Sequence, residues 1–224
     1  MTPALGAGCA LVGVDIPSLG EIRVPYLLRS GSSPLSLRTV AVLLVSGLVL
    51  MHVPVSADTG AGARLAAERC DRCHESSVPA RPSLDGQPQV YLVAQLRAFR
   101  ERSRSKPAMV DVMAALTDQE IRNLAEHYSG REPNPPDVVI DAALTEAGRS
   151  KASAMHCGKC HGPALRGAES GAARLAGQKP AYTAWSLQLM KSGVRPHSGG
   201  KDPLLASLTN DEINALAAFF ASLR

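Results

Sequence analysis

The sequence has little net charge, few cysteines and few aromatic side chains. Its 24 lysines and arginines against 20 aspartates and glutamates give a net charge of only +4, too small an excess for a surface that binds nucleic acid. Five cysteines in 224 residues are too few for a disulfide scaffold. With 45% hydrophobic and 20% charged residues, the composition is that of a globular protein with one or two domains. Disordered, collagen-like and multi-span membrane chains are excluded.

An apolar run near the N-terminus is too short to cross a bilayer. It extends from Val40 to Met51, against the roughly 20 residues of a membrane-spanning helix, and it follows two arginines. The tripeptide Val55-Ser56-Ala57 that comes next is typical of a signal-peptide cleavage site. We expect residues 1–57 to be a leader that is cleaved after Ala57, with the mature chain in the periplasm. An uncleaved membrane anchor is the alternative.

Removal of the leader takes Cys9 with it and leaves four cysteines in two identical patterns. These are the C-x-x-C-H pentapeptides Cys70-Asp71-Arg72-Cys73-His74 and Cys157-Gly158-Lys159-Cys160-His161. Two thiols three residues apart on one helical turn can form thioethers with the two vinyl groups of a haem, and the adjacent histidine then binds the iron. The motifs therefore predict two haem c groups, attached through Cys70, Cys73, Cys157 and Cys160, with His74 and His161 as iron ligands.

A zinc site and a redox-active dithiol are the two alternatives to haem attachment for paired cysteines. One zinc site made from both C-x-x-C pairs would leave the histidine after each pair unexplained. A redox-active dithiol would be expected between a strand and a helix, with no histidine required. Export also favours haem attachment, because this modification follows translocation.

The second half of the chain repeats the first. Leu84-Asp85-Gly86-Gln87 matches Leu175-Ala176-Gly177-Gln178, and a tyrosine follows each at the same spacing. Later, the segment that begins Leu116-Thr117 matches the one that begins Leu208-Thr209. The repeat is too long for a solenoid unit and indicates a duplicated domain. We predict one domain over 58–130, a proline-rich linker over 131–140 and a second domain over 141–224.

Each copy shows helices and loops without the alternation of a strand. Thr117 with Glu120, and Thr209 with Glu212, are capping boxes that predict the start of a last helix in each copy. A further helix is expected to lead into each C-x-x-C-H motif. The fold class is therefore all-α. Since each copy is small and has few aromatic residues, we expect a buried haem to complete its core.

The two motifs, the Leu-x-Gly-Gln segments and the closing Leu-Thr helices resemble cytochrome c4, a family with two tandem class I cytochrome c domains. The resemblance covers about Ala57 to Arg224. It implies one histidine and one methionine ligand for each iron, and a periplasmic carrier that often delivers electrons to a terminal oxidase. In the first domain the family position of the methionine is Met109, with Met113 as the competing candidate.

The second copy departs from this pattern, because Lys201 stands where the methionine is expected. No methionine lies between Met190 and the C-terminus, and Met190 itself falls inside a predicted core helix. Removing a proton from lysine at pH 7 costs about 4.6 kcal/mol, whereas histidine costs almost nothing. We therefore favour His197 over Lys201 as the iron ligand, and an open sixth position remains an alternative.

The predicted function is electron transfer without catalysis. The chain would carry electrons between redox partners, either freely or as the cytochrome subunit of a dehydrogenase, with a dehydrogenase or a terminal oxidase as the partner protein. We expect no nucleic-acid partner, and membrane association only through a partner or an uncleaved signal. The alternative is a haem enzyme or ligand-binding cytochrome that uses the second iron.

Overall fold

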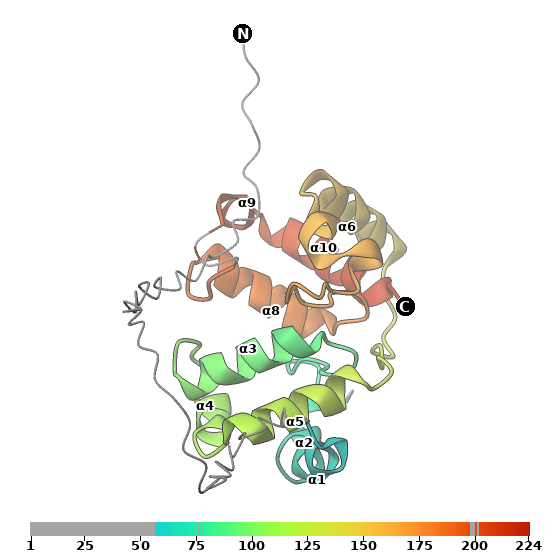
Figure 1. Cartoon of the computed structure of the whole chain (residues 1–224). Helices are drawn as coiled ribbons and strands as arrows, with labels where there is room; N and C mark the ends of the chain where they lie inside the picture. The colour runs from blue at the N-terminus through green and yellow to red at the C-terminus, as the bar shows by residue number, and fades with distance from the viewer. Residues whose placement is uncertain (1–56, 76, 198–199, 201) are drawn as a thin grey trace, which may run out of the picture. The chain divides into compact units, whose positions relative to one another are not determined.

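The structure is a computed structural model that describes residues 57–75, 77–197, 200 and 202–224. Residues 1–56 of the predicted leader, which include Cys9, and Lys201 lie outside these residues. We call residues 57–130 the first lobe and residues 141–224 the second lobe. The helices of the first lobe are α1 (Thr59–Arg69), α2 (Asp71–His74), α3 (Gln89–Arg100), α4 (Pro107–Met113) and α5 (Asp118–Ser129) (Figure 1).

The second lobe repeats this order of helices. It contains α6 (Ala142–Ala154), α7 (Cys157–His161), the 3-10 helix η1 (Pro163–Leu165), α8 (Pro180–Lys191), α9 (Pro203–Ala206) and α10 (Asn210–Ser222). The described part of the chain contains no β-strand, so the all-α prediction is confirmed. None of the helices described is long and apolar enough to span a membrane.

Both predicted capping boxes are present at the start of the last helix of each lobe. The Thr117 hydroxyl accepts from the Glu120 backbone N–H, and the Glu120 carboxylate accepts from the Thr117 backbone N–H. Thr209 and Glu212 make the same reciprocal pair at the start of α10. These bonds satisfy backbone donors that the first turn of a helix leaves without partners.

A glycine allows the first and last helices of each lobe to pack closely. A Cβ atom on Gly62 of α1 would lie 2.2 Å from the Asn123 carbonyl oxygen of α5, and one on Gly148 of α6 would lie 2.0 Å from the Ala215 carbonyl oxygen of α10. Both distances are far inside van der Waals contact. The duplication therefore preserves a helix crossing in which backbone lies directly on backbone.

Each lobe has its own hydrophobic core. The first is built around Leu92, Met113, Ile121, Leu124 and Tyr128. The second is built around Leu205, Leu208, Ile213, Leu216 and Phe220. The separate cores agree with a duplication, while the domain limits at 58–130 and 141–224 remain predictions.

The attachment motifs lie on short helices of their own, contrary to the expectation that the upstream helix runs into them. In the first lobe Cys70 has φ −117° and interrupts the helical path between α1 and α2. In the second lobe His156 adopts φ 55°, a left-handed conformation that ends the path of α6 before α7 begins. Each motif is therefore separated from the preceding helix by a break in the backbone.

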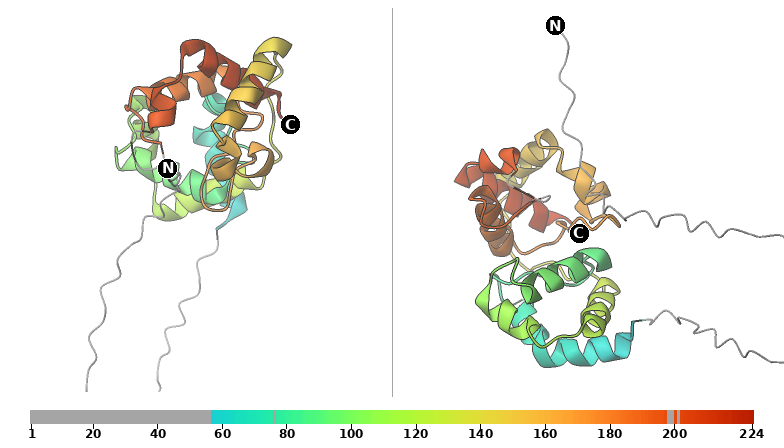
Figure 2. Two further views of the ribbon diagram at one scale, coloured as in Figure 1. Left: turned by 90° about the horizontal axis from the view of Figure 1, so that it is seen from above. Right: turned by 60° about the vertical axis from the view of Figure 1, so that its left-hand side comes forward.

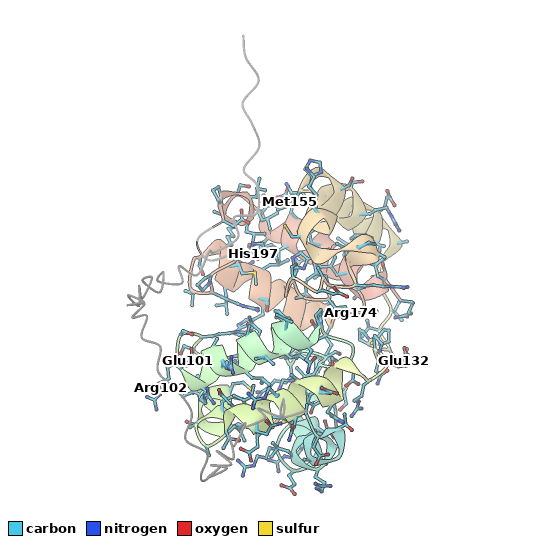
Figure 3. The ribbon with its side chains drawn as sticks, in the orientation of Figure 1. Glu101, Arg102, Glu132, Met155, Arg174 and His197 are labelled. Atoms are coloured by element: carbon cyan, nitrogen blue, oxygen red, sulfur yellow. The ribbon has the colours of Figure 1, made fainter. Side chains whose placement is uncertain are left out.

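Ser56–Arg224 form one compact unit, and its two groups of helices can be followed in Figure 2. Reciprocal hydrogen bonds join the two lobes. The Gln87 side chain donates to the Arg174 carbonyl at 2.9 Å and accepts from the Arg174 N–H at 3.0 Å. The Gln178 side chain does the same with Ser83, at 3.0 and 2.8 Å. Arg174 thus lies where the second lobe meets the first (Figure 3). The repeated Gly-Gln segments are an interface between the lobes, which the sequence did not reveal.

Candidate haem-binding sites

The first motif presents its cysteines within one helical turn. The backbone N–H groups of Cys73 and His74 donate to the Cys70 carbonyl at 3.0 and 3.1 Å. Cys70 is buried and Cys73 is half-buried. Burial raises the pKa of the Cys70 thiol to about 11, so the thiol is neutral at pH 7. The turn brings Cys70, at the start of α2, close to Cys73 and His74 in the helix.

The orientation of His74 is set by a backbone carbonyl in the loop after the motif. Its Nδ1 lies 3.0 Å from the Pro82 oxygen. Because a carbonyl only accepts, Nδ1 carries the proton, and Nε2 of the neutral ring holds the lone pair. Burial lowers the pKa of His74, which favours this neutral form. A histidine that ligates a metal commonly has its second nitrogen held in this way.

The second motif repeats this arrangement on α7. His161 Nδ1 lies 2.8 Å from the Ala173 carbonyl oxygen. Burial lowers the pKa of His161 and raises that of the Cys157 thiol. Cys157 and Cys160 are both half-buried. Two motifs that are distant in sequence therefore share the same tautomer and the same anchoring contact.

The donors at these sites fit haem c. None of the four cysteines is in a disulfide, and each pair lies in a separate lobe beside a neutral imidazole. Among the described residues, no three side chains of the His, Cys, Asp or Glu type are grouped to hold a bare metal ion. The two C-x-x-C pairs are therefore not brought together as one zinc site.

The two methionines of α4 have different surroundings. Met113 is completely buried within the first core, so its sulfur is enclosed by protein atoms. Met109 is only partly buried and packs at the edge of the same core. A side chain at the edge of the core can turn its sulfur toward a haem without opening a cavity. The packing therefore favours Met109 over Met113.

In the second lobe the structure brings His197 next to the attachment motif. The ring centroids of His161 and His197 are 6.1 Å apart, and their planes are inclined by 19°. His197 is a half-buried residue of the second lobe (Figure 3). Met190 is partly buried against the second core, which agrees with its interpretation as a core residue.

A buried lysine of the second lobe binds the end of the first attachment helix, and sequence reasoning missed it. Lys179 is only 1% exposed, and its Nζ donates to the carbonyl oxygens of His74 at 3.3 Å and Val78 at 3.1 Å, as well as to that of Glu75. The repeat offered a signal, because Lys179 follows the second Gly-Gln pair where the first copy has Pro88.

A second contact between the lobes joins two tyrosines and two arginines. The Arg195 guanidinium donates to the hydroxyl groups of Tyr91 at 3.2 Å and Tyr182 at 3.4 Å. Arg104 donates to the Tyr182 hydroxyl at 3.1 Å. Burial alone would raise the pKa of Tyr182, but the charges of Arg195 and Arg104 outweigh it and lower that pKa to about 8.

Comparisons with known proteins agree with the fold. The Cytochrome c family model matches residues 145–224. Cytochrome c4 of Thiocapsa roseopersicina is 31% identical over 183 residues, which cover 76% of this chain and 95% of that protein. The thiosulfate dehydrogenase electron acceptor of Stutzerimonas stutzeri is 29% identical over 204 residues, which cover 80% of this chain and 92% of that protein.

Among solved structures, reduced recombinant cytochrome c4 from Pseudomonas stutzeri matches with a TM-score of 0.68 and 27% identity. The match covers 75% of this chain and 100% of the Pseudomonas stutzeri chain. The fold therefore agrees with that of a solved cytochrome c4 over most of the described chain. The chain belongs to the cytochrome c4 family, the di-haem c-type cytochromes of class I fold that carry electrons.

Proposed function

We propose that the two C-x-x-C-H motifs each hold one haem c through two thioethers and one histidine ligand. The ligating residues are Cys70, Cys73 and His74 in the first lobe, and Cys157, Cys160 and His161 in the second. The observation that carries this proposal is the anchoring of both histidines. Each has Nδ1 on a backbone carbonyl, at 3.0 and 2.8 Å, and so presents Nε2 for the iron.

Residues around each motif hold it in place. In the first lobe the Tyr128 hydroxyl donates to Asp71 Oδ1 at 2.7 Å and so ties the last helix of the lobe to the motif. When bound, haem c supplies the one-electron couple of its iron. The described residues contribute position and burial, and we assign none of them a catalytic role.

The attachment is tested by intact mass under denaturing conditions, which removes any non-covalent cofactor. We expect the mass of the polypeptide plus two haems. The variant Cys157→Ser with Cys160→Ser should retain one haem, in the first lobe. A wild-type mass equal to the bare polypeptide would refute the proposal.

We assign Met109 as the second iron ligand of the first haem. Its place at the edge of the first core supports this, as does the complete burial of Met113. Met109→Ala should abolish the sulfur-to-iron charge-transfer band and lower the potential of the first haem. Met113→Ala should keep the band and lower the thermal stability, because it opens a cavity in the core. The reverse pattern would move the ligand to Met113.

We further propose that the chain is exported, cleaved after Ala57 and periplasmic. The contacts of Asp58 support this start. Its carboxylate caps α1 by accepting from the Ala61 N–H at 3.0 Å, and its backbone nitrogen donates to Asn123 Oδ1 at 2.9 Å. Cleavage after Ala57 would therefore leave both contacts intact. N-terminal sequencing of the mature protein should begin at Asp58, and retention of Met51 would contradict the proposal.

The partner that we propose is a dehydrogenase or a terminal oxidase, with this chain as a non-catalytic carrier. The relative in Stutzerimonas stutzeri is named as the electron acceptor of thiosulfate dehydrogenase, which supports a dehydrogenase as the donor. Stopped-flow mixing with a purified thiosulfate dehydrogenase and its substrate should reduce the haems. Thiosulfate alone should not reduce them, and reduction without the dehydrogenase would indicate that the chain is itself an enzyme.

A further inference from the structure

We infer that His197 is the sixth ligand of the second haem iron and that Asp202 is its positioning residue. The two haems then differ, with histidine and methionine on the first and two histidines on the second. This inference rests on the proposed attachment of a haem at His161. It goes beyond that proposal because it concerns the opposite face of the second haem.

The distance between the two imidazole rings supports this ligation. The centroids of His161 and His197 are 6.1 Å apart. Two imidazoles that bind one iron from opposite sides, with metal–nitrogen distances of about 2 Å, have centroids about 6 Å apart. His161 already presents Nε2 because its Nδ1 is bonded to Ala173. The separation therefore matches one iron between the two rings.

The orientation of the His197 ring is fixed by Asp202. His197 Nδ1 lies 2.9 Å from Asp202 Oδ2, so an iron bound by this ring would be bound through Nε2. The other carboxylate oxygen of Asp202 accepts from the Leu204 N–H at 2.9 Å and caps α9. A carboxylate held in this way both aims the imidazole and increases its strength as a ligand.

The backbone of His197 is held as firmly as its side chain. Its N–H donates to the Gly200 carbonyl at 2.9 Å, and its carbonyl accepts from the Gly200 N–H at 3.1 Å. This pair is the isolated bridge of the second lobe. Backbone and side chain together restrict the ring to one position beside the attachment helix.

The second lobe has a shorter helix than the first where the methionine ligand is expected, and no methionine follows Met190. In the first lobe α4 has seven residues and carries Met109 in its first turn. In the second lobe α9 has only four residues, and Leu205, which matches Met113 in its spacing to the Leu-Thr pair, is buried in the core as Met113 is. His197 lies ahead of α9, on the side of this helix where the first lobe has Met109 ahead of Met113.

The unequal ligands give the two haems unequal potentials. A methionine ligand raises the potential of a haem relative to a histidine ligand. The first haem is then where an electron rests, and the second haem is where it enters or leaves. The direction of transfer is thus built into the ligands of a duplicated fold.

The test uses the haem-loaded protein and compares His197→Ala with His197→Met. Resonance Raman and electron paramagnetic resonance report the coordination of each haem. Wild type should have two six-coordinate low-spin haems and a sulfur-to-iron charge-transfer band with the intensity expected for one methionine-ligated haem. His197→Ala should make the second haem five-coordinate or water-bound and let the reduced protein bind one carbon monoxide per chain, with the sulfur-to-iron band unchanged.

His197→Met tests whether a side chain at this position reaches the iron, while His197→Ala tests whether the histidine itself is the ligand. It should double the sulfur-to-iron band and bring the potential of the second haem toward that of the first. Asp202→Asn should keep six-coordination and raise the potential of the second haem. The control His127→Ala, in the first lobe, should leave coordination and both potentials unchanged.

Three results would overturn the inference. Wild-type protein that binds carbon monoxide at one haem would show an open site. An unchanged spectrum in His197→Ala would exclude this ligand, as would a loss of coordination in Lys201→Ala alone. Denaturing intact mass separates these results from failure of the proposed function. A mass with two haems leaves that proposal standing, whereas a bare polypeptide ends both.

Discussion

Replacement of Lys179 by methionine should destabilise the protein and change the first haem more than the second. The Lys179 ammonium is almost fully buried and donates to three carbonyl oxygens of the first lobe, those of His74, Glu75 and Val78. Methionine fills a similar volume but provides no donor. The variant therefore removes one charge and three hydrogen bonds that join the lobes.

The size of the effect follows from these contacts. Each buried carbonyl left without a hydrogen-bond partner costs about 1–3 kcal/mol. The total cost for the three carbonyls is smaller than three times this value, because water can hydrate some of them and because the variant no longer has to desolvate an ammonium group. We expect a loss of about 2–4 kcal/mol in the free energy of unfolding. For a protein of this size that corresponds to a fall in Tm of roughly 5–15 °C.

The assay is thermal unfolding of the haem-loaded protein by circular dichroism, together with a redox titration of both haems. Loss of a positive charge next to the His74 carbonyl should lower the potential of the first haem, because that charge favours the reduced iron. Lys191→Met, at the end of α8, is the control and should change Tm little. An unchanged Tm and an unchanged first potential in Lys179→Met would show that the buried contact is without consequence.

Two further predictions concern the helix crossing and the tyrosine between the lobes. Gly148→Ala places a Cβ 2.0 Å from the Ala215 carbonyl oxygen and should lower Tm by several degrees. Gly158→Ala is the control and should leave Tm unchanged, because no atom lies within 4 Å of the added Cβ. Equal melting curves for the two variants would contradict this prediction. Tyr182 has a pKa of about 8 in the folded protein, against about 10 in the unfolded chain. Between about pH 8 and pH 10 the unfolded chain therefore binds more protons at this group than the folded protein does. Tyr182 consequently makes the free energy of unfolding rise with pH across this window. Denaturant unfolding at both ends of the window should show this rise in wild type and a smaller one in Tyr182→Phe, and identical slopes would exclude the effect.

The features that could be predicted from sequence are those that depend on neighbours along the chain. Haem attachment requires two thiols and a histidine within five consecutive residues, so Cys70–His74 and Cys157–His161 could be identified directly. The capping boxes at Thr117 and Thr209 are local for the same reason, since a side chain bonds to the backbone three residues away.

The break between the upstream helix and each motif was not predicted. The apolar pattern of α1 and of α6 continues toward the motif, and no proline or glycine marks the end of either helix. His156 adopts a left-handed backbone conformation, which residues other than glycine adopt only infrequently. The chain turns there because tertiary packing, and not local preference, orients the motif.

By itself, the sequence determined the duplication, the all-α class and the attachment motifs, and it reduced the second distal ligand to a few candidates. Only the tertiary structure placed His197 beside His161, Lys179 on the carbonyls after the first motif, and Gln87 against Arg174. These pairs lie far apart along the chain, and most of them cross between the lobes. Their contacts depend on how separate helices pack, and no local pattern of residue types records that packing.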